Sequence, residues 1–348
     1  MVEQSVTSRN RLDSEEREQK PPIHDEEFWF TDGSAVVVAG DVAFRVYEGL
    51  LTRDSSVFRD LFGARRRSAS AERIDGCVVV RLPDVAEEVR VLLRALLSPW
   101  LYYQTMSFSV VESLIRLGHK YRIQHITVNA LERLKSHYSD DMETWLKAWR
   151  SMYEPGKPCQ PADAIAAVNL ARLTGTLSVL PSALYECSIL PTRVLLQGAQ
   201  HGDAGTATAR LSLEDVERCL DARRLLSQDY LLSALRVMVP ETSADCEDMQ
   251  CAASLEVVLK TFRSGDHQES VLCRYDTLTH RSPLELIRPE PLCGPCQEML
   301  EERHRREQQK TWSRLPEYFG IDVPGWSTRR HSSQETVNAS DSETALVC

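Results

Sequence analysis

The side chains most able to do chemistry in this chain are cysteines near its C-terminal end. Cys293 and Cys296 are separated by Gly294-Pro295, a dipeptide that favours a tight turn. Two thiolates with this spacing can coordinate one tetrahedral Zn²⁺ ion. The sequence therefore predicts Cys293 and Cys296 as the first two ligands of a zinc site. Cys251 and Cys273 are expected to complete the site, with three residues as substitutes: Cys246, His280 and His304.

Two other interpretations of the cysteine pair stay open. The pair can flank a turn that opens a long charged helix over residues 297–314, whose glutamate–arginine pairs mark a solvated face. It can also be a redox pair, but the thioredoxin type follows a strand in a βαβ unit, and only the helix is evident. The sequence contains no phosphate-binding loop, dinucleotide fingerprint or nucleophile elbow. We therefore expect no enzymatic activity and no cofactor other than zinc.

A second candidate site is Ser68, which directly follows the basic run Arg65-Arg66-Arg67. This polar stretch, residues 63–70, is expected to be an exposed loop that joins a helix to a strand and packs as neither. A hydroxyl in this setting suits a basophilic kinase, and the added phosphate would form charge-assisted hydrogen bonds with the arginines. Ser68 is therefore a predicted phosphorylation site.

Charge and composition narrow the class of partner. The 348 residues have a formal net charge of -10, which argues against nucleic acid, because that binding depends on clustered Lys and Arg. No apolar run reaches membrane-spanning length, and the N-terminus lacks a secretory signal pattern. We expect no membrane partner and an intracellular location, in the cytoplasm or nucleus, where the ten cysteines are reduced.

Strands and helices alternate in the first part of the chain. Ala35–Ala39 is apolar and β-branched, residues 40–41 suit a turn, and Val42–Val46 alternates apolar and polar side chains, which predicts a β-hairpin. Ser55 or Ser56 is then expected to cap a helix. The later elements are expected in the order strand, helix, helix, helix: Cys77–Leu82, then 85–96, 109–121 and 126–138.

This succession of elements, over residues 28–139, resembles a BTB/POZ domain. The resemblance rests on the segments 44–51 and 55–58 and on the pair Lys120-Tyr121 at a helix end. It implies an α/β (α+β) module that binds other proteins and performs no chemistry. The sequence departs from the family at Tyr47, where many BTB domains have a histidine, so a structural role is expected there. A second segment, 292–320, resembles the C-terminal end of fungal BTB-domain proteins.

The resemblance also implies the kind of partner. BTB domains commonly pair through a face built around their early helix, so we expect homo- or hetero-oligomerisation, most simply a homodimer. The apolar side chains expected at this face are Leu50, Leu51, Val57, Phe58 and Phe62. A substrate adaptor of a cullin-type ubiquitin ligase is the alternative, since those adaptors also have helices after the BTB domain. A zinc-containing regulatory protein is the third interpretation.

The expected domain organisation has four parts. They are a disordered tail over 1–24, a BTB/POZ domain over 25–139, a mainly α-helical extension over 140–320 that contains the cysteine pair, and a disordered tail over 321–348. Within the extension, residues 198–205 are expected to form a flexible loop, and Ser212 to cap a helix. The aromatic and apolar side chains at 312–319 are expected to fold back on the extension.

Overall fold

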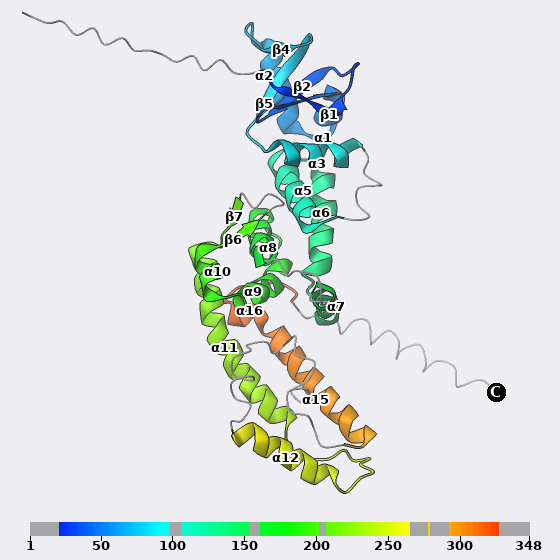
Figure 1. Ribbon diagram of the computed structural model, residues 1–348, viewed down its shortest axis with the longest axis vertical. Helices are drawn as coiled ribbons and strands as arrows, with labels where there is room; N and C mark the ends of the chain where they lie inside the picture. Colours follow the sequence, from blue (N-terminus) through cyan, green and yellow to red (C-terminus); the bar gives the residue numbers. More distant parts are fainter. Residues whose placement is uncertain are drawn as a thin grey trace, which may run out of the picture. The chain divides into compact units, whose positions relative to one another are not determined.

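The computed structural model describes residues 21–97, 106–152, 161–201, 207–264, 278 and 292–326. The chain divides into two compact units, Met1–Pro99 and Trp100–Cys348, which we call the sheet unit and the helical unit. Both are drawn in Figure 1, and the chain as a whole is of the mixed α/β class that the sequence predicts. The division falls inside residues 25–139, for which a single domain was expected, and that domain assignment stays a prediction.

The sheet unit is built on five strands in the order β1-β3-β2-β5-β4. Their bounds are β1 Ile23–Trp29, β2 Ala35–Ala39, β3 Val42–Val46, β4 Arg73–Ile74 and β5 Cys77–Leu82. β2 and β3 form the predicted antiparallel hairpin, and β2 pairs with β5 in parallel. The hairpin turns at Gly40, whose φ of 58° is in the left-handed region that favours glycine.

Three helices accompany the sheet: α1 Glu48–Asp54, α2 Ser56–Arg67 and α3 Ala86–Leu97. All five residues of β2 are buried, as expected for a central strand covered on both faces. Contacts join α2 to β5 and α3 to β2. The predicted cap of α2 is confirmed, because the Ser55 hydroxyl accepts a hydrogen bond of 3.1 Å from the backbone N–H of Phe58.

Two expectations for the sheet unit were wrong. β1 begins at Ile23, inside the stretch expected to be a disordered tail, and pairs in parallel with β3. The polar stretch expected to be a loop continues α2 to Arg67, and β4 follows it. The helix extends because its three terminal arginines suit the negative end of the helix dipole. Arg66 also forms an ion pair with Glu48 of α1.

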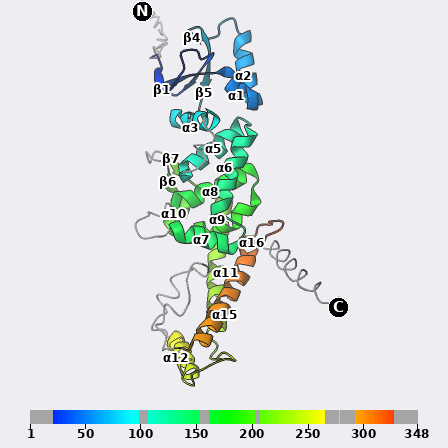
Figure 2. The ribbon, with the colours of Figure 1, turned by 90° about the vertical axis from the view of Figure 1, so that its right-hand side faces the viewer.

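The helical unit contains the predicted succession of helices. Their bounds are α5 Phe108–Lys120, α6 Gln124–His137, α7 Met142–Met152, α8 Pro161–Thr174, α9 Leu180–Ser188, α10 Thr192–Gln197, α11 Leu213–Val237, α12 Cys251–Ser264, α15 Gly294–Ser313 and α16 Leu315–Tyr318. Ser212 caps α11, as predicted. Figures 1 and 2 show α11 and α15 side by side, with α12 at one end of the pair.

Two further expectations need correction in this unit. The stretch expected to be a flexible loop after Gly198 begins with β6, Ala199–His201, which pairs with β7, Ala207–Ala209. The C-terminal tail was expected from residue 321, yet Trp326 is buried and its ring nitrogen donates a hydrogen bond of 2.9 Å to the carbonyl of Trp312. Its ring also lies 5.1 Å from that of Trp312, so aromatic packing extends the ordered structure beyond the predicted end.

An aromatic cluster forms the centre of the helical unit. The ring of Trp145 on α7 lies 5.2 Å from Trp312 on α15 and 5.5 Å from Tyr185 on α9. The predicted fold-back of the chain after α15 is confirmed, since Trp312, Leu315, Tyr318 and Phe319 are all buried. Across the part of the chain that the structure describes, no helix has both the length and the apolar character that crossing a bilayer requires.

Candidate metal centre

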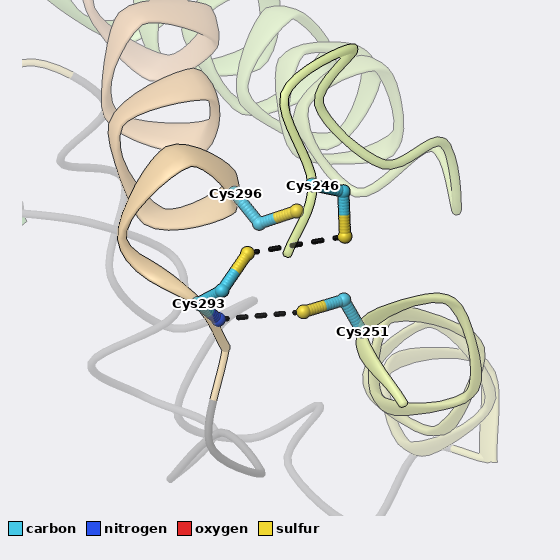
Figure 3. A group of neighbouring side chains, drawn as sticks. All are labelled: Cys246, Cys251, Cys293 and Cys296. Carbon is cyan, nitrogen blue, oxygen red and sulfur yellow. Dashed lines mark hydrogen bonds between the residues drawn. The ribbon is translucent and has the colours of Figure 1, made fainter. Parts of the chain in front are cut away.

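Four cysteines converge at the end of the α11–α15 pair. Cys246 lies in the loop after α11, Cys251 is the first residue of α12, Cys293 is the N-cap residue of α15, and Cys296 lies in the first turn of α15. Figure 3 shows their sulfur atoms pointing toward one another from these separate segments. The site thus joins parts of the chain that are more than 40 residues apart, as the 47-residue separation of Cys246 and Cys293 shows.

The spacing of the sulfur atoms fits a tetrahedral metal ion. All four Sγ atoms lie within 4.8 Å of one another, and those of Cys246 and Cys293 are 3.8 Å apart. Four Zn–S bonds of about 2.3 Å in tetrahedral geometry place the sulfurs about 3.8 Å apart. The four sulfurs are therefore close to the spacing of a complete tetrahedral coordination shell.

Local backbone turns bring each cysteine into position. Before α12, the carbonyls of Ser243 and Asp248 accept hydrogen bonds of 3.1 Å from the N–H groups of Cys246 and Cys251. At α15, the carbonyl of Cys293 accepts from the N–H of Cys296 at 3.1 Å. Pro295 lies in the first turn of this helix, where its missing N–H has no intrahelical partner to lose. The Cys-Gly-Pro-Cys stretch is therefore a helix start rather than an isolated turn.

Backbone N–H groups point at the sulfurs and would share the negative charge of bound thiolates. The N–H of Cys293 donates to the Sγ of Cys251 at 3.3 Å, and that of Ser243 donates to the Sγ of Cys296 at 3.4 Å. The N-termini of α12 and α15 both begin at the cluster, and their dipoles also favour thiolate. Such outer contacts orient metal ligands and hold their charge.

The four thiols differ in acidity. Hydrogen bonds from backbone N–H groups, first that of Glu247, lower the pKa of Cys293 to about 6. Burial raises the pKa of Cys296 to about 12. The N–H of Cys293 acts to lower the pKa of Cys251, but burial and neighbouring thiols outweigh it and the pKa is raised. Metal binding at neutral pH therefore displaces protons from at least two buried thiols.

The cysteines are part of a small apolar core. Cys251 and Cys296 are buried, and Cys246 and Cys293 are partly buried. The other buried members of this core are Val237, Leu255, Leu292 and Leu300. Four sulfur ligands in an apolar setting leave no position for water or substrate, which is the arrangement of structural zinc sites.

Three of the four residues predicted as metal ligands lie together in the structure. Cys251, Cys293 and Cys296 lie in the cluster, and the fourth member is Cys246, which was expected only as a substitute. Cys273 and His280 lie outside the described residues. His304 is buried on α15 and lines a small cavity with Tyr230 and Glu307 instead. It is not a member of the cysteine cluster.

Ser68 lies in the sheet unit, immediately after α2. Its backbone N–H donates to the carbonyl of Arg65, and its side chain is exposed, 3.3 Å from the hydroxyl of Ser70. The hydroxyl is therefore accessible, but at a helix C-terminus rather than within a loop. The negative end of the helix dipole opposes a phosphate here, while the preceding arginines attract it.

The predicted interface residues divide into two groups. Leu51, Phe58 and Phe62 are at most 2% exposed, so they are core side chains and the expectation that they supply an outer face was wrong. The reason is that α1 and α2 pack on each other and α2 packs on β5. Leu50 and Val57 remain half-buried. Tyr47 is 40% exposed, and its hydroxyl donates to a carboxylate oxygen of Asp32 at 2.8 Å.

Comparisons with known proteins add no family to these observations. No protein-family model matches the chain, and a search of curated proteins found no match. The geometry of the cysteine cluster and the order of the elements are therefore the features that point to a function.

Proposed function

We propose that this protein binds one zinc ion through Cys246, Cys251, Cys293 and Cys296, and that the ion has a structural role. The observation that carries this proposal is the mutual approach of the four Sγ atoms, all within 4.8 Å. Ordinary core cysteines from two distant segments of the chain would have no reason to bring their sulfur atoms to one point. An all-sulfur tetrahedral set selects zinc or iron rather than magnesium or calcium.

Elemental analysis of the full-length protein, purified without added metal, tests the proposal. About one zinc per chain is expected, and the Cys296→Ser variant should bind much less. Cys219→Ser is a matched control, because Cys219 is also a buried thiol of the helical unit, its Sγ donates to the carbonyl of Leu184 at 3.8 Å, and it is not a member of the four-cysteine cluster. This control should retain its zinc. A wild-type protein that contains iron instead, or that takes up no zinc when the ion is supplied, would contradict the proposal.

We also propose a second function, for residues 25–139, as a protein-binding module of the BTB/POZ type. The supporting observation is the succession along the chain of β2, β3, α1, α2, the two-residue strand β4, β5, α3, α5 and α6, since the resemblance implies a hairpin, a helix, a third strand and further helices. The expected assembly is a homodimer, and the alternative is an adaptor of a cullin-type ubiquitin ligase. The four cysteines lie outside these residues.

Sedimentation of the full-length protein over a range of concentrations tests this second function. A concentration-dependent dimer is expected, and Leu50→Asp or Val57→Asp should weaken it, because these side chains retain accessible surface. Thr52→Asp is a control at a half-buried polar position of α1. A protein that stays monomeric, together with an affinity purification that recovers a cullin, would favour the adaptor. Monomers with no cullin would remove both interpretations.

A further inference from the structure

Sulfur takes part in the attachment of α12 to the rest of the helical unit. Among its described side chains, Cys251, Ser254 and Leu255 are buried and Leu259 is half-buried, whereas Ala252, Ala253, Glu256, Val257 and Lys260 are exposed. A hydrogen bond between α15 and α12 has the Sγ of Cys251 as its acceptor. An ion pair on α12, between Lys260 and Glu256, lies within the helix. Among the described side chains of α12, Leu255 is therefore the fully buried aliphatic one that accompanies the cysteine.

The attachment of α15 to α11 is of a different kind. Glu307 of α15 accepts from Arg236 at 2.9 Å and from the Ser233 hydroxyl at 3.4 Å, both on α11. Farther along, Thr311 donates to the carboxylate of Asp229. Buried side chains follow this contact along α15: Leu300, His304, Gln308 and Trp312. None of these contacts uses a ligand sulfur, so α15 has its own means of staying on α11.

Because α12 and α15 are attached differently, loss of the metal should affect the two helices differently. A helix of 14 residues is marginal in water by itself, and one buried and one half-buried leucine offset only part of the conformational entropy lost on ordering it. A bound metal ion would link Cys251 to the three cysteines outside α12. For α15 the same ion would add less, because an ion pair, hydrogen bonds and a row of buried side chains already hold that helix on α11.

We infer that metal occupancy of the four-cysteine site controls the docking of α12, while α15 stays bound to α11 in both states. This inference rests on the proposed zinc binding and adds its consequence. Release of the ion frees α12 and uncovers the apolar side chains of Val237, Leu292 and Leu300, which form a core with Leu255 in the docked state. The site then acts as a metal-dependent switch of one surface of the helical unit.

Hydrogen exchange of the full-length protein, read by mass spectrometry, tests this inference. Three samples are compared: zinc-loaded protein, protein stripped by a chelator, and the Cys251→Ser variant. Amides of residues 252–264 should exchange at least about tenfold faster in the second and third samples, as expected for a segment that opens locally. Amides of residues 226–237 on α11 and 300–313 on α15 should change by less than about twofold. The Cys219→Ser variant should match zinc-loaded wild type throughout.

The outcomes separate this inference from the zinc proposal. Zinc content is measured in the same samples, so a protein that never holds zinc overturns both. A protein that binds zinc but keeps α12 protected after stripping overturns the inference alone. Loss of protection in α11 and α15 together with α12 also overturns it, because the ion would then hold the whole helical pair. Only selective loss in α12 supports the switch.

Discussion

The sheet unit and the helical unit differ in what their interiors contain. Among the described residues, the buried polar or ionisable side chains of the sheet unit are Asp25, Ser55 and Cys77, and the rest of its core is apolar. The helical unit buries many more polar or ionisable groups, including Glu186, Asp215 and Glu307, in addition to its cysteines. An apolar interior is indifferent to pH and chelators, whereas an interior of thiols and carboxyls is not. The two halves should therefore respond differently to the same solution conditions.

The contrast is sharpest at the cysteine cluster. The centre of the sheet is filled by valines on neighbouring strands, Val36 and Val38 on β2 and Val79 on β5. At the end of the α11–α15 pair, two of the six residues in the buried core are cysteines. Where a small core has too few apolar side chains, a metal can supply the missing stabilisation. The contrast can be tested by unfolding the full-length protein in urea and following peptides of each unit separately by pulsed hydrogen exchange.

The largest effect is expected from Cys296→Ser. The free energy of unfolding of the cluster region should fall by on the order of 5 kcal/mol, because structural zinc contributes roughly 10 kcal/mol or more in small zinc-binding domains. A chelator should destabilise wild type but have no further effect on this variant, and sheet-unit peptides should unfold at the same urea concentration in all samples. An additional loss on chelation in the variant would mean that the metal is held by other residues.

Phe58→Ala should destabilise the sheet unit and leave the cysteine cluster unchanged. This ring is 1% exposed and lies 6.4 Å from that of Phe62, so its removal leaves a cavity that costs about 3 to 5 kcal/mol. The loss should appear in sheet-unit peptides, and zinc content should not change. Val57→Ala, next to it but half-buried, should cost about 1 kcal/mol or less. Equal losses for the two variants would contradict the burial on which the contrast depends.

The two halves also differ in how far the sequence predicts them. β2, β3 and β5 have strong apolar and alternating patterns with a turn glycine between them, so their bounds could be predicted residue by residue. β1, with the sequence IHDEEFW, has no such pattern. Its place depends on long-range ion pairs, of Arg90 with Asp25 at 2.7 Å and of Arg94 with Glu27 at 2.6 Å. Contacts between residues more than 60 positions apart leave no local signal.

The candidate site shows the same limit. Cys293 and Cys296 could be recognised because their spacing is local, whereas Cys251 was predicted as a ligand without any helix being expected there. The place of Cys246 in the cluster depends on two features that the sequence does not show. One is the turn in which the N–H of Cys246 donates to the carbonyl of Ser243, and the other is the packing of that turn against α15. The sequence distance of five residues between Cys246 and Cys251 was the available signal, and it did not separate Cys246 from Cys273.

Replacement of Glu186 is expected to change how the stability of the helical unit depends on pH. Its carboxyl is buried on α9, accepts a hydrogen bond of 2.9 Å from the ring nitrogen of Trp145, and lies 3.8 Å from Nε2 of His137. Burial raises the pKa of Glu186 from 4.5 to about 8 and lowers the pKa of His137 from 6.5 to about 4. Because the folded pKa of Glu186 is raised, its contribution to the free energy of unfolding is fully present below pH 4.5 and is lost as pH rises toward 8. Because the folded pKa of His137 is lowered, its contribution is present above pH 6.5 and is lost as pH falls toward 4.

Of these two groups, only Glu186 changes its contribution to stability between pH 6.5 and pH 8. In this window the carboxyl of Glu186 should lower the stability of wild type by up to about 1.4 kcal/mol per pH unit. Glu186→Gln stays neutral and can still accept from Trp145, so the stability difference between this variant and wild type should change by that amount. Glu132→Gln is the control, because that carboxyl is exposed and pairs with Lys135, and it should follow wild type. A Glu186→Gln variant with the same slope as wild type would place the titrating group elsewhere.

An effect of similar size is expected at Asp25, the buried carboxylate of the sheet unit. Burial acts to raise the pKa of Asp25, but hydrogen bonds from Arg90 and from the N–H groups of Phe28 and Glu27 outweigh it and hold the pKa below its ordinary value of 3.8. Asp25→Asn should therefore cost roughly 2 kcal/mol at pH 7, seen as a lower urea midpoint for sheet-unit peptides.

The pH dependence of this cost follows from the direction of the shift. A depressed pKa means that the contribution is present above pH 3.8 and disappears as pH falls through the folded value, so variant and wild type should converge in strong acid and run parallel from pH 5 to 8. Glu27→Gln removes the exposed pair with Arg94 and should cost less than about 1 kcal/mol. If Asp25→Asn changed the slope of sheet-unit stability between pH 5 and 8, the sheet unit would have a titrating interior after all, and the contrast between the two halves would be one of degree.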